Sequence, residues 1–173
     1  MKPARAAKRS AREDYAAKMV APFAVLGIRT ADEFVTAIEY LPRDAPRLAP
    51  KNRVAERACE ELAHYLRDPA FRFDLATAAR GTAFQRRVWD AIREIPPGAS
   101  MSYGDLARKL NTAPRAIGKA CGANPIALVV PCHRVVGGRG AIGGFMGTAE
   151  GGPLAIKAWL LRHEGCRAGE RES

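Results

Sequence analysis

The segment RAIGKACGANPIALVVPCHRVV (residues 115–136) decides how the C-terminal half of the chain folds. A short helix is predicted from Pro114 to about Ala123, because proline suits the first turn of a helix. The Asn-Pro pair at 124–125 ends this helix, since a residue that precedes proline disfavours the helical conformation. The aliphatic run Ile126–Val130 then predicts a buried strand. This strand leads the chain to a cysteine that is followed by a histidine.

A second short helix precedes the one at 114–123. The stretch Tyr103–Leu110 predicts a helix after the capping residue Ser102, and three residues (111–113) separate the two helices. Two short helices joined in this way are typical of a helix-turn-helix, although such pairs are also common in proteins that do not bind DNA. The second helix carries small residues that would let it lie close to another helix or to a sugar-phosphate chain. They are Ala116, Gly118, Ala120 and Gly122.

Further elements flank this pair of helices on both sides. Thr82 predicts an N-cap, and the apolar residues from Phe84 to Ile92 follow at helical spacing. On the other side, a glycine-rich segment (137–152) leads to a final helix from Leu154 to about His163. The C-terminal half therefore predicts a helical domain with a winged helix-turn-helix-like motif.

The N-terminal half predicts a small α/β domain. Phe23–Thr30 and Phe34–Leu41 are rich in β-forming residues on either side of a turn, which predicts a β-hairpin. Apolar residues then recur every four positions from Val54 to Leu66 and predict an amphipathic helix that ends before Pro69.

The sequence thus predicts an α/β (α+β) fold in four parts. Residues 1–19 are expected to form a basic flexible arm, with helical turns near 12–18, and residues 20–79 the N-terminal α/β domain with its hairpin. Residues 80–167 are expected to form the C-terminal domain, and residues 168–173 a tail.

The formal net charge of +10 is concentrated in two of these parts. Residues 1–18 hold six Lys/Arg and two Asp/Glu, and residues 80–167 hold 13 Lys/Arg and five Asp/Glu. Residues 19–79 hold eight and nine, so they are nearly balanced. Clustered positive charge favours a polyanion such as nucleic acid as the partner, with improved solubility as the alternative explanation.

Neither a membrane nor a metal is expected from the composition. No apolar run approaches the roughly 20 residues that cross a bilayer. The four cysteines, Cys59, Cys121, Cys132 and Cys166, show neither a disulfide pattern nor metal-ligand spacing. A reducing, cytoplasmic setting fits free thiols best. Cys59 and the nearby His64 are expected to be packing residues.

Cys132 is the candidate nucleophile. A thiol reacts as its thiolate, an imidazole can accept its proton, and a carboxylate can fix the imidazole tautomer. His133 and Glu164 supply those two groups. On a regular strand Cys132 and His133 would point to opposite faces, so either the backbone turns there or a water molecule bridges them. Cys166 with His163 is a rival pair, expected to be exposed near the C-terminus and outside any pocket.

The sequence PCHRV (131–135) resembles the active-site motif of the O6-alkylguanine-DNA alkyltransferases, also called methylated-DNA–protein-cysteine methyltransferases. The resemblance covers nearly all of residues 81–165 in order, and the N-terminal half resembles the small domain of that family more loosely. The other similar blocks are GTAFQRRVW (81–89), IPPG (95–98), SYGDLA (102–107), RAIGKACGANP (115–125) and KAWLLRHEG (157–165).

This resemblance implies DNA repair by direct alkyl transfer. The alkyl group of O6-alkylguanine, and also of O4-alkylthymine, would move onto Cys132 after the base is flipped out of the duplex. The thioether product is stable, so each molecule would act once and would need no cofactor. The implied partner is double-stranded DNA that carries the lesion, and the protein would be a cytoplasmic monomer.

The resemblance also implies roles for individual residues. His133 would relay the proton of the acceptor thiol through water, and Glu164 would orient His133. Tyr103 would donate a hydrogen bond to the flipped guanine and crowd the phosphate that rotates with it. Arg115 would fill the gap left in the base stack. Asn124 would join the recognition helix to the active-site strand.

Further implied contacts lie on the recognition helix and around the base pocket. The DNA contacts are Ala116, Gly118 and Lys119, and the pocket residues are Val135, Phe145 and Met146. Phe145 replaces the usual tyrosine of the family, Met146 stands where some members have a serine, and the segment 148–153 is longer than usual. These departures leave the preferred size of the alkyl group open. The metal-binding cysteines of some relatives are absent near the N-terminus, which again predicts no zinc.

Three other functions fit parts of the sequence. A lesion sensor on the same fold would flip damaged bases without repairing them, but such relatives lack the acceptor cysteine that Cys132 provides here. A helix-turn-helix regulator would explain the basic half and leave the PCHRV motif unexplained. A thiol hydrolase would need an oxyanion hole and repeated turnover.

Overall fold

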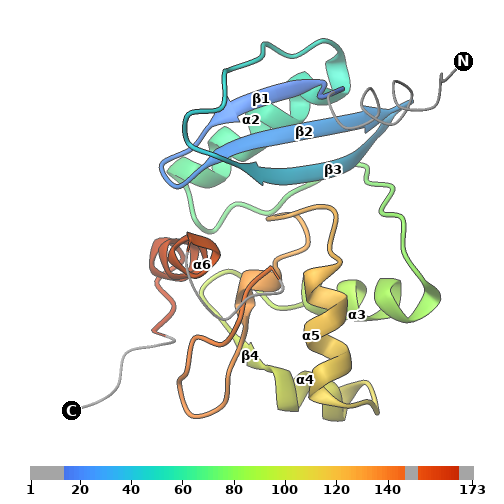
Figure 1. The fold of residues 1–173 in the computed structure, drawn as a ribbon, viewed down its shortest axis with the longest axis vertical. Coiled ribbons are helices and arrows are strands. Elements are labelled where there is room, and N and C mark those ends of the chain that lie inside the picture. The colour runs from blue at the N-terminus through green and yellow to red at the C-terminus, as the bar shows by residue number, and fades with distance from the viewer. Residues whose placement is uncertain (1–13, 147–151, 168–173) are drawn as a thin grey trace, which may run out of the picture.

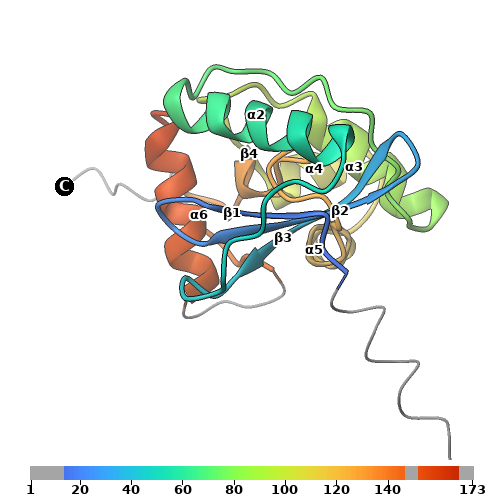
Figure 2. The same ribbon diagram turned by 90° about the horizontal axis from the view of Figure 1, so that it is seen from above.

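The computed structural model describes residues 14–146 and 152–167, which form two packed halves (Figure 1). The N-terminal half contains an antiparallel sheet in the order β1 (Ala17–Val20), β2 (Val25–Ala31) and β3 (Phe34–Leu41). Helix α2 (Arg53–Arg67) packs against all three strands and runs along one side of the sheet (Figure 2). The predicted hairpin is therefore confirmed as β2 and β3, and the predicted amphipathic helix is confirmed as α2.

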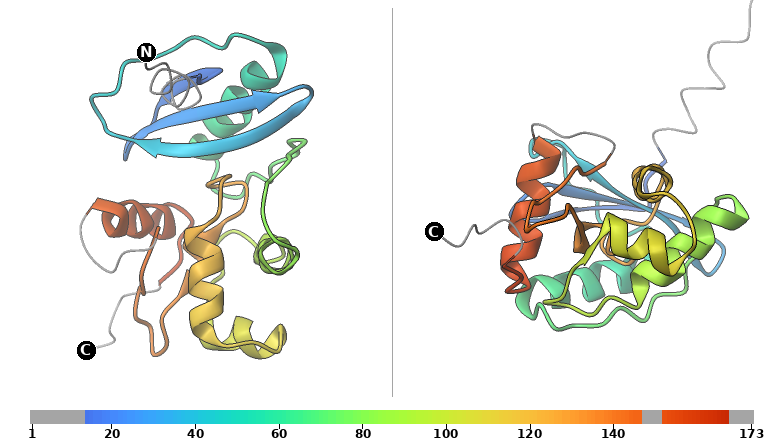
Figure 3. Two further views of the ribbon diagram at one scale, coloured as in Figure 1. Left: turned by 45° about the vertical axis from the view of Figure 1, so that its right-hand side comes forward. Right: turned by 90° about the horizontal axis from the view of Figure 1, so that it is seen from below.

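Helices form most of the C-terminal half. They are α3 (Ala83–Arg93), α4 (Tyr103–Lys109), α5 (Pro114–Gly122) and α6 (Gly152–His163), with a short 3₁₀ helix η1 at Cys132–Arg134. The two-residue strands β4 (Met101–Ser102) and β5 (Val135–Val136) pair in parallel. The structure thus confirms the helix at Thr82, the α4–α5 pair and the final helix. Figure 3 shows the helical half stacked against the sheet half, with α6 beneath the sheet.

Local sequence explains where these helices begin. The Thr82 side chain accepts from the backbone N–H of Gln85, and the Gln85 side chain accepts from the N–H of Thr82, which is a capping box. Trp89 of α3 then donates its indole N–H to the carbonyl of Ala120 in α5 at 2.8 Å. Phe84, which shares the helical spacing of the buried residues, is instead exposed. Trp159 of α6 is half-buried.

Two hydrophobic clusters form the core of the described residues, and the first of them holds the halves together. The first joins the sheet, α2 and α6, and it also contains Ile126 and Leu160 from the C-terminal half. The second joins α3, α4 and α5, and it contains Cys132 and Phe145. Because the first cluster draws on both halves, the division at residues 79/80 stays a prediction. No helix in the described part of the chain is both long and apolar enough to cross a membrane.

The expectation of a flexible arm over all of residues 1–19 is wrong at its end, because strand β1 begins at Ala17. Ala17 pairs with Ile28 of β2 and Val20 with Val25, so residues 17–19 belong to the sheet, and the predicted helical turns are wrong over the described residues 14–18. Ala17 is fully buried, and Ala16 next to it is buried as well. These small apolar side chains pack at the edge of the sheet, and their burial favours a strand although charged residues stand nearby in the sequence. Residues 1–13 lie outside the described part of the chain, as do residues 168–173 of the expected tail.

The expected strand Ile126–Val130 is also wrong. The backbone of Leu128 has φ +70°, and the amide of Val130 donates to the carbonyl of Ile126, so the segment turns back on itself. The start of this segment still lies alongside β3. The amide of Ile38 donates to the carbonyl of Pro125, and the carbonyl of Ile38 accepts from the amide of Ala127. Aliphatic residues predicted burial correctly at positions 126, 128 and 130, but a compact buried turn needs the same residue types as a strand.

Candidate active site

Cys132 lies at the start of the 3₁₀ helix η1, directly after Pro131, and is 5% exposed. The amide of Cys132 donates to the carbonyl of Val130, and the amide of Arg134 donates to that of Pro131. The backbone therefore turns at the Cys-His pair, which is one of the two alternatives that the sequence left open. In a 3₁₀ turn consecutive side chains are about 120° apart, so they do not point to opposite faces as on a strand.

Asn124 braces this turn from the end of α5. Its side-chain amide donates to the carbonyl of Val130 at 2.9 Å and lies 3.3 Å from the Cys132 Sγ. Its carbonyl oxygen accepts from the amide of Ile126 at 3.0 Å. The Asn124 side chain thus joins the end of α5, the buried turn at residues 126–130 and the Cys132 thiol.

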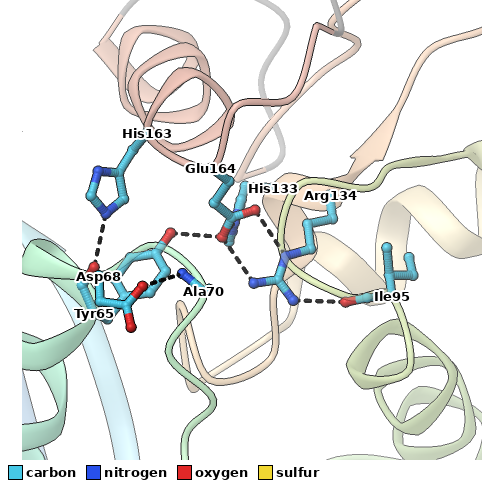
Figure 4. A network of polar contacts seen from close by, with 8 residues as sticks. All are labelled: Tyr65, Asp68, Ala70, Ile95, His133, Arg134, His163 and Glu164. Atoms are coloured by element: carbon cyan, nitrogen blue, oxygen red, sulfur yellow. Dashed lines mark hydrogen bonds and ion pairs between the residues drawn. The ribbon is translucent and has the colours of Figure 1, made fainter.

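His133, Arg134 and Glu164 form a buried polar network (Figure 4). The His133 Nε2 lies 2.9 Å from the Glu164 Oε1. Arg134 donates to both carboxylate oxygens, from Nη2 to Oε1 at 2.8 Å and from Nε to Oε2 at 3.0 Å. Its Nη1 donates to the carbonyl of Ile95 at 2.7 Å. The buried charges of Glu164 and Arg134 therefore compensate each other, as buried charges require.

The network fixes the tautomer of His133. Hydrogen bonds from His133 and Arg134 hold the pKa of Glu164 well below its ordinary value, despite burial, so Glu164 is an ionised acceptor. The His133 Nε2 must then carry the proton, and Nδ1 is left as the free acceptor. Burial lowers the pKa of His133, and the charges of Arg134 and Lys157 lower it further against the opposing effect of Glu164. At neutral pH His133 is an uncharged base.

The Cys132 thiol needs such a base in order to react. The adjacent Cys121 thiol and burial raise the pKa of Cys132 well above its ordinary value, while Asn124 and Lys157 act in the opposite direction. The resting state of Cys132 is therefore the thiol, and its reaction requires that a proton leaves. His133 supplies the neutral nitrogen for that proton.

Tyr103 and Lys157 form a second polar cluster beside the thiol. The Tyr103 hydroxyl donates to the carbonyl of Gly144 at 2.9 Å. Lys157 of α6 is fully buried, and its Nζ donates to the carbonyls of Val135 at 2.6 Å and Gly144 at 2.8 Å. Burial lowers the pKa of Lys157 to about 8. These contacts tie α6 to the loop that carries Phe145.

A groove of about 810 Å³ opens onto this side of Cys132. It brings together residues that the sequence analysis assigned to DNA contact and to the base pocket. They are Tyr103, Arg115, Gly118, Lys119, Cys132, Phe145 and Met146. Ala116 and Val135 do not line it, and Val135 is fully buried. Arg115 and Lys119 are exposed, and the space over Gly118 is open, so this face of α5 can approach a large ligand closely.

The departures from the family pattern lie at the edge of the groove. Phe145 is buried, with its ring centroid 5.9 Å from that of Tyr40 in β3. Met146 is exposed and has φ +53°. Most of the longer segment 148–153 lies outside the described residues.

A second cavity, of about 330 Å³, reaches Cys132 from the side of the sheet. It is lined by Tyr40 of β3, by Asn124 and by His133, so the N-terminal half contributes to the surroundings of the thiol. Burial raises the pKa of Tyr40, and so does the negative charge of Glu164. Within residues 14–146 and 152–167, no group of three or more His, Cys, Asp or Glu side chains could hold a metal.

Sequence reasoning missed several residues around the site. They are Tyr40, Tyr65, Cys121, Arg134 and Lys157. Of these, Lys157 carried a signal, because it shares the apolar helical spacing of Leu154 and Leu161. The rival pair His163 and Cys166 was expected to be exposed, and this expectation is wrong because both are half-buried. His163 stacks on Trp159, and its Nε2 contacts the carbonyl of Tyr65.

Comparison with known protein families identifies residues 83–166 as "6-O-methylguanine DNA methyltransferase, DNA binding domain". The methylated-DNA–protein-cysteine methyltransferase of Salmonella typhimurium is 54% identical over 93 residues, which are 53% of this chain and 52% of the relative. The protein of the same name from Methanosarcina acetivorans is 43% identical over 110 residues, 62% of this chain and 67% of the relative. The chain spans about half the length of the Salmonella relatives that it matches.

Solved structures show the similarity across nearly the whole fold. The O6-methylguanine methyltransferase of Mycobacterium tuberculosis superposes with a TM-score of 0.70 at 30% identity, over 89% of this chain and 94% of that one. The OGT of the same organism in complex with DNA superposes with a TM-score of 0.71 at 34% identity, over 87% of this chain and 92% of that one. The likeness therefore includes the N-terminal half.

Proposed function

Because this chain belongs to the 6-O-methylguanine DNA methyltransferase family, we propose that it repairs DNA by moving the alkyl group of O6-alkylguanine onto its own Cys132. O4-alkylthymine is the second substrate of this proposal. One observation carries it: a buried thiol lies at the base of a groove and next to a neutral histidine that a carboxylate orients. The protein acts as a monomer in the cytoplasm and uses no cofactor.

The proposed reaction begins with a proton transfer. His133 accepts the proton of Cys132 through a water molecule, and Glu164 stabilises the imidazolium that forms. The thiolate then attacks the alkyl carbon, a carbon–sulfur bond forms, and the carbon–oxygen bond to the base breaks. The electron pair of that bond stays on the base, and Tyr103 stabilises the developing charge by donating a hydrogen bond. A proton returns to the base, and Cys132 remains as a thioether.

Binding of the lesion requires that the base leaves the duplex. Flipping a base costs a few kcal/mol, and less for a poorly paired, alkylated guanine. Arg115 lies exposed at the start of α5 on the rim of the groove, where a long planar cation can replace the flipped base in the stack. Gly118 and Lys119 contact the backbone of the same strand in this proposal. Phe145 stacks on the guanine, and Met146 covers it from the exposed edge.

Stoichiometry tests the proposal against its rivals. A duplex with one O6-methylguanine is added in increasing amounts to a fixed amount of protein, and the restored guanine is counted by nucleoside chromatography. A plateau at one guanine per protein is the expected result. Continued turnover would support a hydrolase-like activity, and no restored guanine with tight binding would support a lesion sensor or regulator; both outcomes contradict the proposal.

Replacing Arg115 by alanine should affect duplex substrates selectively. We expect the repair rate on duplex to fall about tenfold or more, because the variant loses the side chain that offsets the cost of flipping. The rate with free O6-benzylguanine should stay within about twofold, since that substrate needs no flipping. Arg43→Ala, which removes an exposed arginine outside the groove, is the matched control. Equal losses on both substrates would remove the flipping role of Arg115.

Binding should also depend steeply on salt. Each phosphate contact releases counterions, so the logarithm of the affinity falls linearly with the logarithm of the salt concentration. Fluorescence anisotropy with a labelled duplex between low and physiological salt measures this slope. Lys119→Ala should reduce the slope by about one unit, because one phosphate contact is lost. A slope near zero for the unaltered protein would contradict binding through the groove face of α5.

A further inference from the structure

We infer that the N-terminal half takes part in the chemistry through Tyr65 of α2, whose hydroxyl is a positioning group for the Glu164–His133 pair. The inference rests on the proposed function in one respect only, namely that Cys132 reacts with His133 as its base. It assigns to the N-terminal half a role in the reaction besides folding.

The Tyr65 hydroxyl reaches the network from a distant part of the chain. It donates to the Glu164 Oε1 at 2.8 Å, across 99 residues of sequence, and Tyr65 is 1% exposed (Figure 4). The same oxygen accepts from the His133 Nε2 at 2.9 Å and from the Arg134 Nη2 at 2.8 Å. Three donors therefore share the oxygen that orients the catalytic imidazole.

The tyrosine itself is held in two ways by the end of α6. His163 lies 2.8 Å, through its Nε2, from the backbone carbonyl of Tyr65, while the next residue, Glu164, accepts from the side chain. The Tyr65 ring also packs edge-on against the His163 ring, with the ring centroids 5.2 Å apart, and at a tilt against the Phe73 ring at 5.5 Å. These contacts hold the backbone and ring of Tyr65 against the end of α6, while the hydroxyl itself is held by Glu164.

The direction in which Tyr65 shifts the pKa of His133 follows from the fact that its hydroxyl donates a hydrogen bond to Glu164. Burial and the Glu164 charge raise the pKa of Tyr65, so the phenol stays protonated and acts only as a donor. Each donor on the carboxylate lowers its affinity for a further proton, and a less basic carboxylate attracts the imidazole proton less strongly. The Tyr65 hydroxyl therefore helps to keep His133 neutral. Its removal should make His133 more basic and extend the imidazolium form to higher pH.

Other charged and titratable groups surround the Glu164–His133 pair and contribute to its electrostatic environment. They are Tyr40 of β3, Cys132 and Arg134 of η1, and Lys157 of α6. None of these is altered by a change at Tyr65 that removes only the hydroxyl, so the comparison between variants isolates the contribution of that group.

The test measures the reactivity of Cys132 against pH with iodoacetamide, with the site of modification located by peptide mapping. We expect Tyr65→Phe to move the acidic limb of this profile to higher pH by about half a unit or more, because a hydrogen bond to a charged group is lost. His163→Ala, which removes the contact to the backbone and leaves the hydroxyl in place, should move the limb much less. Urea denaturation checks that both variants are folded.

For a second variant we expect the acidic limb of the profile to move in the opposite direction. Site-specific replacement of Tyr65 by 3-fluorotyrosine keeps the ring and strengthens the donor, so the acidic limb should move to lower pH. An unchanged profile in folded Tyr65→Phe, or equal shifts in Tyr65→Phe and His163→Ala, would overturn the inference. If Tyr65→Phe does not fold, the direction of the fluorotyrosine shift decides the question. Because iodoacetamide needs no DNA, the outcome is separate from failure of the proposed repair reaction.

Discussion

Replacing Cys132 by alanine is expected to abolish alkyl transfer to the protein completely, while the affinity for duplex DNA changes by less than about twofold. The sulfur is the acceptor atom in the proposed reaction. Cys121 also lines the groove, but Cys132 is the thiol that directly precedes His133 in η1 and contacts Asn124. The binding surface survives, because Arg115 and Lys119 are exposed on α5 and do not depend on a buried sulfur. Chromatography of restored guanine measures transfer, and anisotropy measures binding.

Cys166→Ala is the matched control for this experiment. Cys166 is half-buried beyond α6, and it forms the rival pair with His163 in the sequence. Its removal should leave transfer unchanged. Residual transfer in Cys132→Ala would place the acceptor elsewhere, and loss of transfer together with equal loss of binding would show that Cys132 serves the fold instead.

Replacing Glu164 by glutamine is expected to lower the free energy of unfolding by about 3–5 kcal/mol. The carboxylate side chain is fully buried and pairs with Arg134 through two hydrogen bonds. Glutamine keeps the volume but leaves the guanidinium in the interior without a counter-charge, and this penalty exceeds the value of the pair itself. Urea denaturation followed by tryptophan fluorescence measures the change.

Glu94→Gln provides the comparison for an exposed pair. Glu94 contacts Lys109 at 2.8 Å on the surface, where solvent screens the charges, so no measurable change in stability is expected. If Glu164→Gln and Glu94→Gln unfold at the same urea concentration as the unaltered protein, the buried network does not hold the active site together.

The Glu164 carboxylate also makes the stability of the protein depend on pH in the acidic range. The folded pKa of Glu164 lies below its ordinary value of 4.5, so its ionised form is favoured by folding. Its contribution is fully present above about pH 4.5 and is lost as the pH falls toward the lower folded value. The difference in stability between the unaltered protein and Glu164→Gln should therefore narrow below pH 4.5, and a difference that stays constant would contradict this account.

Short-range signals in the sequence predicted most elements of the fold. The N-cap Thr82, the turn before Phe34 and the Asn-Pro pair at 124–125 each act within a few residues, and the elements begin or end at or next to the positions that these signals predict. Strand β1 was missed because its evidence is a partner strand and a buried edge, which local charge conceals. The turn at Leu128 was missed because an aliphatic run predicts burial and does not predict the path of the backbone.

The candidate site shows the same division between local and long-range information. Cys132 and His133 are neighbours in sequence, and the motif that contains them was visible without a structure. Tyr65 and Lys157 depend on contacts across 99 and 22 residues, respectively, which no local pattern specifies. Glu164 was named from the sequence, but the two further residues that pair with it, Arg134 and Tyr65, come from the packing of α6 against both halves.

The central claim is that Cys132 itself takes the alkyl group, and intact-protein mass spectrometry tests it most directly. The protein is mixed with an excess of duplex that carries one O6-methylguanine, and its mass is compared with that of protein mixed with unmodified duplex. The account predicts the mass of one added methyl group, saturating at one per protein and located on Cys132 by peptide mapping. An unchanged mass, or a methyl group mapped to another residue, would contradict it.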